Sequence, residues 1–225
     1  ADFHQIVADM ANISRTQAKT INLGLFYGMG KIKLQKELGL DKVKANELFA
    51  DYHKKVPFVK ILSQDLVSFA KDNRLLFTLY DRFCRFNMFE TTNRKWNPKI
   101  NRFDEVPLLS EAEALREFEI EYRKVAKTVE EDFIKYFKNY YVPAFTYKAL
   151  NRLIQGSAAD MTKKAMVDLY EKGIIPHIQI HDELCISVAN KYEANIIQCV
   201  MEEAIPLEIK NKVNCKKGMN WGSIK

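Results

Sequence analysis

Two cations, an apolar residue and a tyrosine recur at four-residue steps near the start of the sequence. They are Arg15, Lys19, Leu23 and Tyr27, and Gly28 follows the tyrosine. Four-residue steps keep side chains on one slowly drifting face of a helix, and a helix N-terminus favours anions. Such a face suits a nucleoside triphosphate, with its phosphates on the cations and its base near the tyrosine. An ordinary amphipathic helix with solvated basic residues explains the same spacing equally well.

Two adjacent carboxylates, Asp182 and Glu183, lie between short alternating runs of apolar and polar residues. The alternation predicts a hairpin with its turn near His181–Glu183. Carboxylate oxygens on a rigid turn are a plausible site for divalent cations, because Mg²⁺ prefers hard oxygen ligands. A purely polar turn is the alternative, since aspartate is common in turns.

Two amide side chains, Asn151 and Gln155, share one face of a predicted helix, and the small residues Gly156, Ala158 and Ala159 follow. Neutral amides can donate hydrogen bonds to the minor-groove acceptors that every correct base pair presents. The alternative is a close helix contact that the small residues permit.

Together and in this order, four segments resemble the family A DNA polymerases, the group of bacterial DNA polymerase I and the replicative enzymes of short-tailed phages. The segments are RTQAKTINLGLFYG (15–28), NRLIQGSAADMTKKAM (151–166), IQIHDEL (178–184) and GMNWGSIK (218–225). The first is similar to motif B on the fingers helix, and IQIHDEL is similar to motif C in the palm. The resemblance starts at Asp2 and reaches the C-terminus, apart from one insertion.

The resemblance implies a role for each matching residue. It implies catalytic roles for Lys19, as the acid that protonates the leaving pyrophosphate, for Asp182, as a metal ligand, and for Glu183, as a supporting metal carboxylate. The implied nucleotide contacts are His4, Arg15, Lys19, Leu23 and Tyr27. The implied DNA contacts are Arg82, Asn151, Gln155, Gln179 and His181.

The implied activity is template-directed DNA synthesis, in which a primer 3′-hydroxyl attacks the α-phosphorus of a dNTP with two Mg²⁺ ions as cofactors. The implied partners are primer-template DNA and dNTP. Motif A, which carries the other metal-binding aspartate, is expected upstream of Ala1 together with the thumb. We therefore expect the chain to be inactive alone and to work with an upstream polymerase segment. The alternative is a non-catalytic module that binds nucleic acid or a partner and retains the polymerase fold.

Two positions depart from the family pattern. Leu23 occupies a site where the family has Phe or Tyr, which puts sugar selectivity in doubt. Arg82 lies in YDRFCR, where the family has D-G-R-R.

For the elements that must position these residues, the resemblance implies an α+β fold, with mostly helical fingers and a small antiparallel palm sheet, which is an incomplete right-hand polymerase fold. We expect fingers over 1–86, an insertion with a long, interrupted charged helix over 87–146, and the C-terminal part of the palm over 147–225. Within the insertion, 87–109 is predicted to be irregular, and a packing brace is favoured over a DNA contact or a docking arm. A Ser14–Gln17 capping box predicts a helix over 15–28, and a terminal strand is predicted near 207–215.

Composition is consistent with this picture. Lysine and arginine exceed aspartate and glutamate by 35 − 29 = 6, which fits a polyanionic partner. The four cysteines have no C-x-x-C spacing, which argues against a zinc site. No apolar run approaches 18 residues, so no membrane partner is expected, and we expect a cytoplasmic location, in the bacterial host if the protein is phage-encoded.

Overall fold

The computed structural model describes residues 2–11, 13–27, 29–55, 57–97, 99, 102–125 and 131–223. The chain divides into two compact units. The first comprises residues 1–77 and 83–152, and the second comprises 78–82 and 153–225. Each unit is described by itself. Within the described residues, helices and small antiparallel sheets confirm the expected α+β fold class.

The first unit begins with five helices, including the one predicted after the Ser14–Gln17 capping box. They are α1 (Phe3–Ala11), α2 (Arg15–Phe26), α3 (Lys31–Leu38), α4 (Lys42–Lys55) and α5 (Pro57–Asn73). The Ser14–Gln17 capping box is present, because each residue's backbone N–H donates to the other's side chain. Gly39 ends α3 with φ 61°, the left-handed conformation that glycine adopts without cost. Gly28, predicted to end α2, lies outside the described residues.

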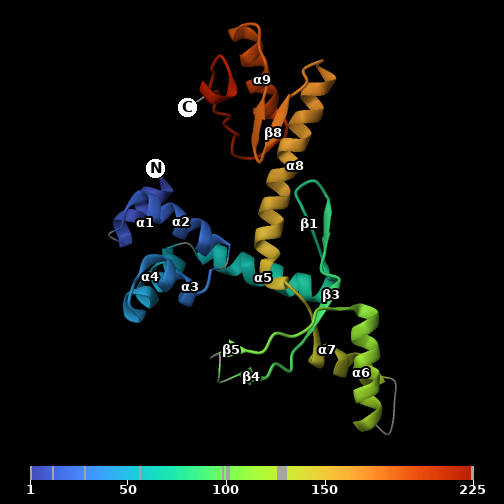
Figure 1. The fold of residues 1–225 in the computed structure, drawn as a ribbon. Coiled ribbons are helices and arrows are strands. Elements are labelled where there is room, and N and C mark those ends of the chain that lie inside the picture. Colours follow the sequence, from blue (N-terminus) through green and yellow to red (C-terminus); the bar gives the residue numbers. More distant parts are fainter. Residues whose placement is uncertain are drawn as a thin grey trace. The chain divides into compact units, whose positions relative to one another are not determined.

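The strands β1 (Leu75–Phe77) and β2 (Phe83–Arg85) then form an antiparallel hairpin (Figure 1). Its base packs on α5 through a buried cluster of Ala70, Leu76, Phe86 and Ala149. The guanidinium of Arg152 lies 4.5 Å from the centre of the Phe86 ring. The two strands of the hairpin belong to unit 1, whereas its tip, residues 78–82, belongs to unit 2.

The segment 87–109, predicted to be irregular, contains short strands instead. They are β3 (Met88–Thr91), β4 (Trp96–Asn97), β5 (Arg102–Phe103) and β6 (Leu109–Ser110). β3 is the centre of a three-stranded sheet between β6 and β7 (Tyr141–Pro143). The prediction was wrong because β3 pairs with β7 about fifty residues further along the chain, which local sequence signals do not reveal. Pro143 lies on an edge strand, where the missing N–H is tolerated.

The predicted interrupted helix appears as α6 (Glu111–Val125) and α7 (Glu131–Tyr140). Both helices pack on β3 through an aromatic cluster in which Phe89, Phe118 and Phe137 are buried. Edge-to-face contacts order this cluster, with ring centroids of Phe118 and Phe137 5.5 Å apart. The helical spacing of the aromatic residues thus serves packing inside unit 1.

The second unit contains most of α8 (Ala149–Glu171), which starts in unit 1 after a 3₁₀ turn at Thr146–Lys148. It then has the hairpin β8 (Ile178–Ile180) and β9 (Glu183–Cys185), helix α9 (Lys191–Glu203) and a 3₁₀ turn at Trp221–Ser223. The strand predicted near 207–215 is not formed. Side chains of α9 satisfy the Val213 backbone instead: Gln198 donates to its carbonyl, and its N–H donates to Glu202.

Candidate nucleotide-binding and catalytic sites

Helices α1 and α2 pack together through the small and apolar residues Val7, Ala8 and Ala18. Ala8 is 2% exposed and Ala18 is fully buried at this helix contact. The two helices carry His4, Arg15 and Lys19, which the sequence singled out. All of them lie in unit 1.

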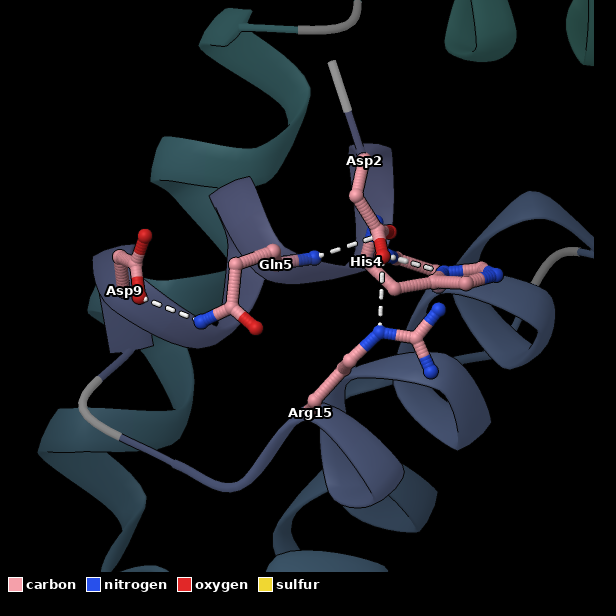
Figure 2. Close-up of polar contacts among 6 residues, drawn as sticks. Asp2, His4, Gln5, Asp9 and Arg15 are labelled. Atoms are coloured by element: carbon pink, nitrogen blue, oxygen red, sulfur yellow. Dashed lines mark hydrogen bonds and ion pairs between the residues drawn. The ribbon is translucent and has the colours of Figure 1, made fainter.

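Asp2 links the starts of the two helices (Figure 2). One carboxylate oxygen accepts the backbone N–H of His4 at 3.0 Å, which caps α1. The other accepts Nε of Arg15 at 2.8 Å. The hydrogen bond from Arg15 is the main reason why the pKa of Asp2 lies below its usual value. Asp2 therefore holds Arg15 at the N-terminus of α2, where the Arg15 side chain is half exposed.

His4 is linked to α2 by a second polar contact. Its ring Nδ1 lies 2.9 Å from the amide nitrogen of Asn22, a residue that is only 2% exposed. Sequence reasoning selected His4 but missed Asn22 and Asp2. The sequence signal for Asn22 was an amide beside Ala18 and Ile21 on one helix face, and the signal for Asp2 was an aspartate two residues before His4.

The remaining residues of the α2 face lie along the same helix. Lys19 is exposed one turn after Arg15, Leu23 is 44% exposed, and Tyr27 follows the helix end half-buried. The structure thus brings His4, Arg15, Lys19 and Leu23 to one pair of packed helices. Two cations and an apolar side chain on an accessible face can hold a phosphate group beside a flat ligand.

The carboxylate pair lies in unit 2 at the tip of the β8–β9 hairpin. Ile180 pairs with Glu183, so the loop has two residues, His181 and Asp182. His181 adopts φ 52°, and its carbonyl accepts a 2.5 Å hydrogen bond from Gln179, which braces the turn. Asp182 and Glu183 are both exposed. The predicted turn position is confirmed, and the two carboxylates are adjacent there.

These two carboxylates supply oxygen donors of the kind that Mg²⁺ prefers, and such ions are commonly held by one or two carboxylates plus phosphate and water. Among the described residues, no cluster of three or more His, Cys, Asp or Glu side chains could hold a metal ion. The two carboxylates of the hairpin therefore fit part of a Mg²⁺ coordination sphere.

Arg82, at the tip of the β1–β2 hairpin, has an internal partner. Its Nε donates to Asp160 at 2.7 Å and its Nη2 donates to the Gly156 carbonyl at 3.0 Å, both on α8. Burial alone would raise the pKa of Asp160, but hydrogen bonds from Thr78 and Arg82 outweigh it and hold that pKa below its usual value. The tip is thus fastened to α8 within unit 2, and Asp160 is a residue that sequence reasoning missed.

The two amides singled out for DNA contact, Asn151 and Gln155, are four residues apart on α8. Asn151 is half-buried and Gln155 is exposed. Asn151 belongs to unit 1 and Gln155 belongs to unit 2.

Comparison with known proteins decides the family. The model of "DNA polymerase family A" matches residues 2–104 and 112–223. The chain belongs to DNA polymerase family A. The match includes most of the segment 87–146.

Several named DNA polymerases are similar over nearly the whole of this chain. A DNA-directed DNA polymerase of Pseudomonas phage M6 is 31% identical over 98% of this chain. DNA polymerase I of Caldicellulosiruptor bescii is 28% identical over 96%, and that of Bacillus subtilis is 28% identical over 97%. The chain spans 31% of the phage protein and 21% of each bacterial one.

A solved structure shares the fold. It is the POL domain of Pol1 from M. smegmatis, in complex with DNA primer-template and dNTP. The TM-score is 0.60 at 21% identity, covering 93% of this chain and 32% of that one. None of the described helices is both long and apolar enough to cross a membrane.

Proposed function

We propose that this chain takes part in template-directed DNA synthesis, the transfer of a nucleotide from a dNTP to a primer 3′-hydroxyl. The observation that carries the proposal is the α1–α2 pair. It presents His4, Arg15 and Lys19 on two closely packed helices of a chain that belongs to DNA polymerase family A. The chain contributes the nucleotide-binding helix of the fingers and one carboxylate-bearing turn of the palm.

The nucleotide lies along α2 in this proposal. Arg15, Lys19 and His4 bind its phosphates, and charge-assisted hydrogen bonds make the two cations the strongest contacts. Lys19 also gives a proton to the leaving pyrophosphate. Leu23 forms an apolar wall, and Tyr27 lies near the templating base. Arg15 reaches the phosphates through the end of the guanidinium that faces away from Asp2 (Figure 2).

Asp182 would hold catalytic Mg²⁺, and Glu183 would support it. Mg²⁺ bound there would supply activation of the attacking hydroxyl and charge neutralisation at the leaving oxygen. Register places Glu183 on the same strand face as Ile178 and Ile180, because paired residues share a face. Asp182, in the loop, is the carboxylate free of that strand geometry, and we assign it the main role.

The DNA contacts proposed are Asn151 and Gln155 on α8 with Gln179 and His181 on the hairpin. The side chain of Gln179 donates a hydrogen bond to the His181 carbonyl. In this proposal Gln179 therefore positions His181 for its DNA contact, and it also contacts the DNA itself. Arg82 stays a predicted DNA contact, although its bonds to Asp160 and Gly156 give it a structural role first. A polymerase segment that carries motif A and the thumb is the proposed protein partner.

Primer extension tests this function. The chain is mixed with a separately produced segment carrying motif A and the thumb, plus primer-template, dNTP and Mg²⁺. We expect extension with the wild type and with the control Glu203→Gln, an exposed carboxylate on α9. Asp182→Asn should lower the rate at least about a hundredfold, because metal stabilisation supplies several kcal/mol.

Two results would contradict the proposal. One is a folded mixture that binds DNA but extends no primer with the wild type, which favours the non-catalytic binding module. The other is equal extension by Asp182→Asn and wild type.

A further inference from the structure

The contact between His4 and Asn22 defines which ring nitrogen of the histidine carries the proton. The amide nitrogen of Asn22 lies 2.9 Å from Nδ1 of His4. An amide nitrogen can only donate, so Nδ1 must accept, and the proton of the neutral imidazole is then on Nε2. The ring therefore has one fixed hydrogen-bond donor, on its other edge.

The burial of Asn22 makes this contact directional. The residue is 2% exposed, and its amide oxygen is buried without a hydrogen-bond partner. The reversed amide would let the oxygen accept from a protonated Nδ1, but it would leave a buried N–H₂ group without an acceptor. Buried N–H groups without a partner are rarer than under-satisfied carbonyls, so the orientation with Nδ2 toward His4 is favoured.

The backbone of His4 is fixed as well. Its N–H donates to Asp2 at the cap of α1, and the same carboxylate holds Arg15 (Figure 2). Asn22 lies three residues after Lys19 and seven after Arg15 on α2. One helix thus carries both phosphate-binding cations and the amide that orients the histidine.

We propose that Asn22 is a positioning residue that holds His4 in the Nε2–H tautomer and aims this donor at the nucleotide phosphates. The second half of this statement rests on the proposed function, and the first half does not. A neutral N–H adds a directional hydrogen bond beside two cations without placing a third charge among them. Asn22 itself contacts no phosphate in this arrangement.

The tautomer can be read without any nucleotide. Long-range proton–nitrogen NMR spectra of ¹⁵N-histidine-labelled chain distinguish the two ring nitrogens. We expect wild-type His4 to carry its proton on Nε2. Asn22→Asp offers only acceptors and should move the proton to Nδ1, whereas the apolar, similarly sized Asn22→Leu should give a mixture. A wild-type proton on Nδ1, or the same spectrum in all three proteins, overturns the proposal.

Nucleotide affinity tests the second half. Asn22→Leu is compared in the wild-type and His4→Ala backgrounds by calorimetry with dNTP and Mg²⁺. We expect about a fivefold loss in the wild-type background, typical of one hydrogen bond, and less than about a twofold loss beside His4→Ala. Equal losses in both backgrounds overturn the positioning role. Absence of wild-type binding contradicts the proposed function, and the nucleotide-free NMR result separates the two failures.

Discussion

Asp160 shows how a single buried carboxylate connects two parts of unit 2. Its side chain is 7% exposed and accepts from Arg82, whose side chain is 47% exposed. The partners are 78 residues apart in sequence, so no local pattern could pair them. The α2 cations, in contrast, could be predicted because helix geometry alone places residues four apart on one face.

Asp160→Asn should make the free energy of unfolding less dependent on pH in the acidic range. The folded-state pKa of Asp160 is lowered, so its contribution is complete above its unfolded value of about 4 and is lost as pH falls through the folded value. We expect the variant to be about 1–3 kcal/mol less stable at pH 7. The difference should shrink toward pH 3, as measured by urea unfolding. A difference that is constant with pH would contradict the ion pair.

At the scale of elements, the start of α2 depends on the capping box. Ser14→Ala removes the hydroxyl that accepts the Gln17 N–H and should lower the free energy of unfolding by about 1 kcal/mol. Ser68→Ala, at an exposed position inside α5, is the control and should change it by less than about 0.5 kcal/mol. Equal effects in urea unfolding would mean that the cap does not stabilise the helix.

The contact between the β1–β2 tip and α8 depends on Gly156. A Cβ atom there would lie 2.8 Å from Cγ2 of Thr78, so Gly156→Ala should destabilise by about 1–3 kcal/mol, although alanine normally favours a helix. Thermal unfolding of Gly156→Ala with and without Thr78→Ser measures this. The serine removes Cγ2 and keeps the hydroxyl, so it should restore much of the loss, and no rescue would place the strain elsewhere.

Helices were predictable where caps and breakers mark their ends, as at Ser14, Gly39 and Pro57. The hairpin around Asp182 was predictable because its strands are adjacent in sequence. β3 was missed because its partners are distant, and the strand near 207–215 was wrongly expected because α9 side chains bind the Val213 backbone. Short strands depend on their partners more than on their own residues.

At the scale of the whole molecule, the excess of six positive charges should make DNA binding sensitive to salt. We expect the dissociation constant for a primer-template to rise at least about tenfold between 50 and 200 mM salt, because bound counterions are released on binding. Fluorescence anisotropy with labelled DNA measures this. An affinity that does not change with salt would argue against contacts to the phosphate backbone.

The central claim is that the α2 face binds nucleotide phosphates, and calorimetric titration of dNTP with Mg²⁺ tests it most directly. Lys19→Ala removes one charge-assisted contact and should weaken binding by about 1.5–3 kcal/mol, roughly tenfold or more. Lys33→Ala, an exposed cation on α3, is the matched control and should bind like the wild type. Equal affinities of the Lys19→Ala, Lys33→Ala and wild-type chains would contradict the account.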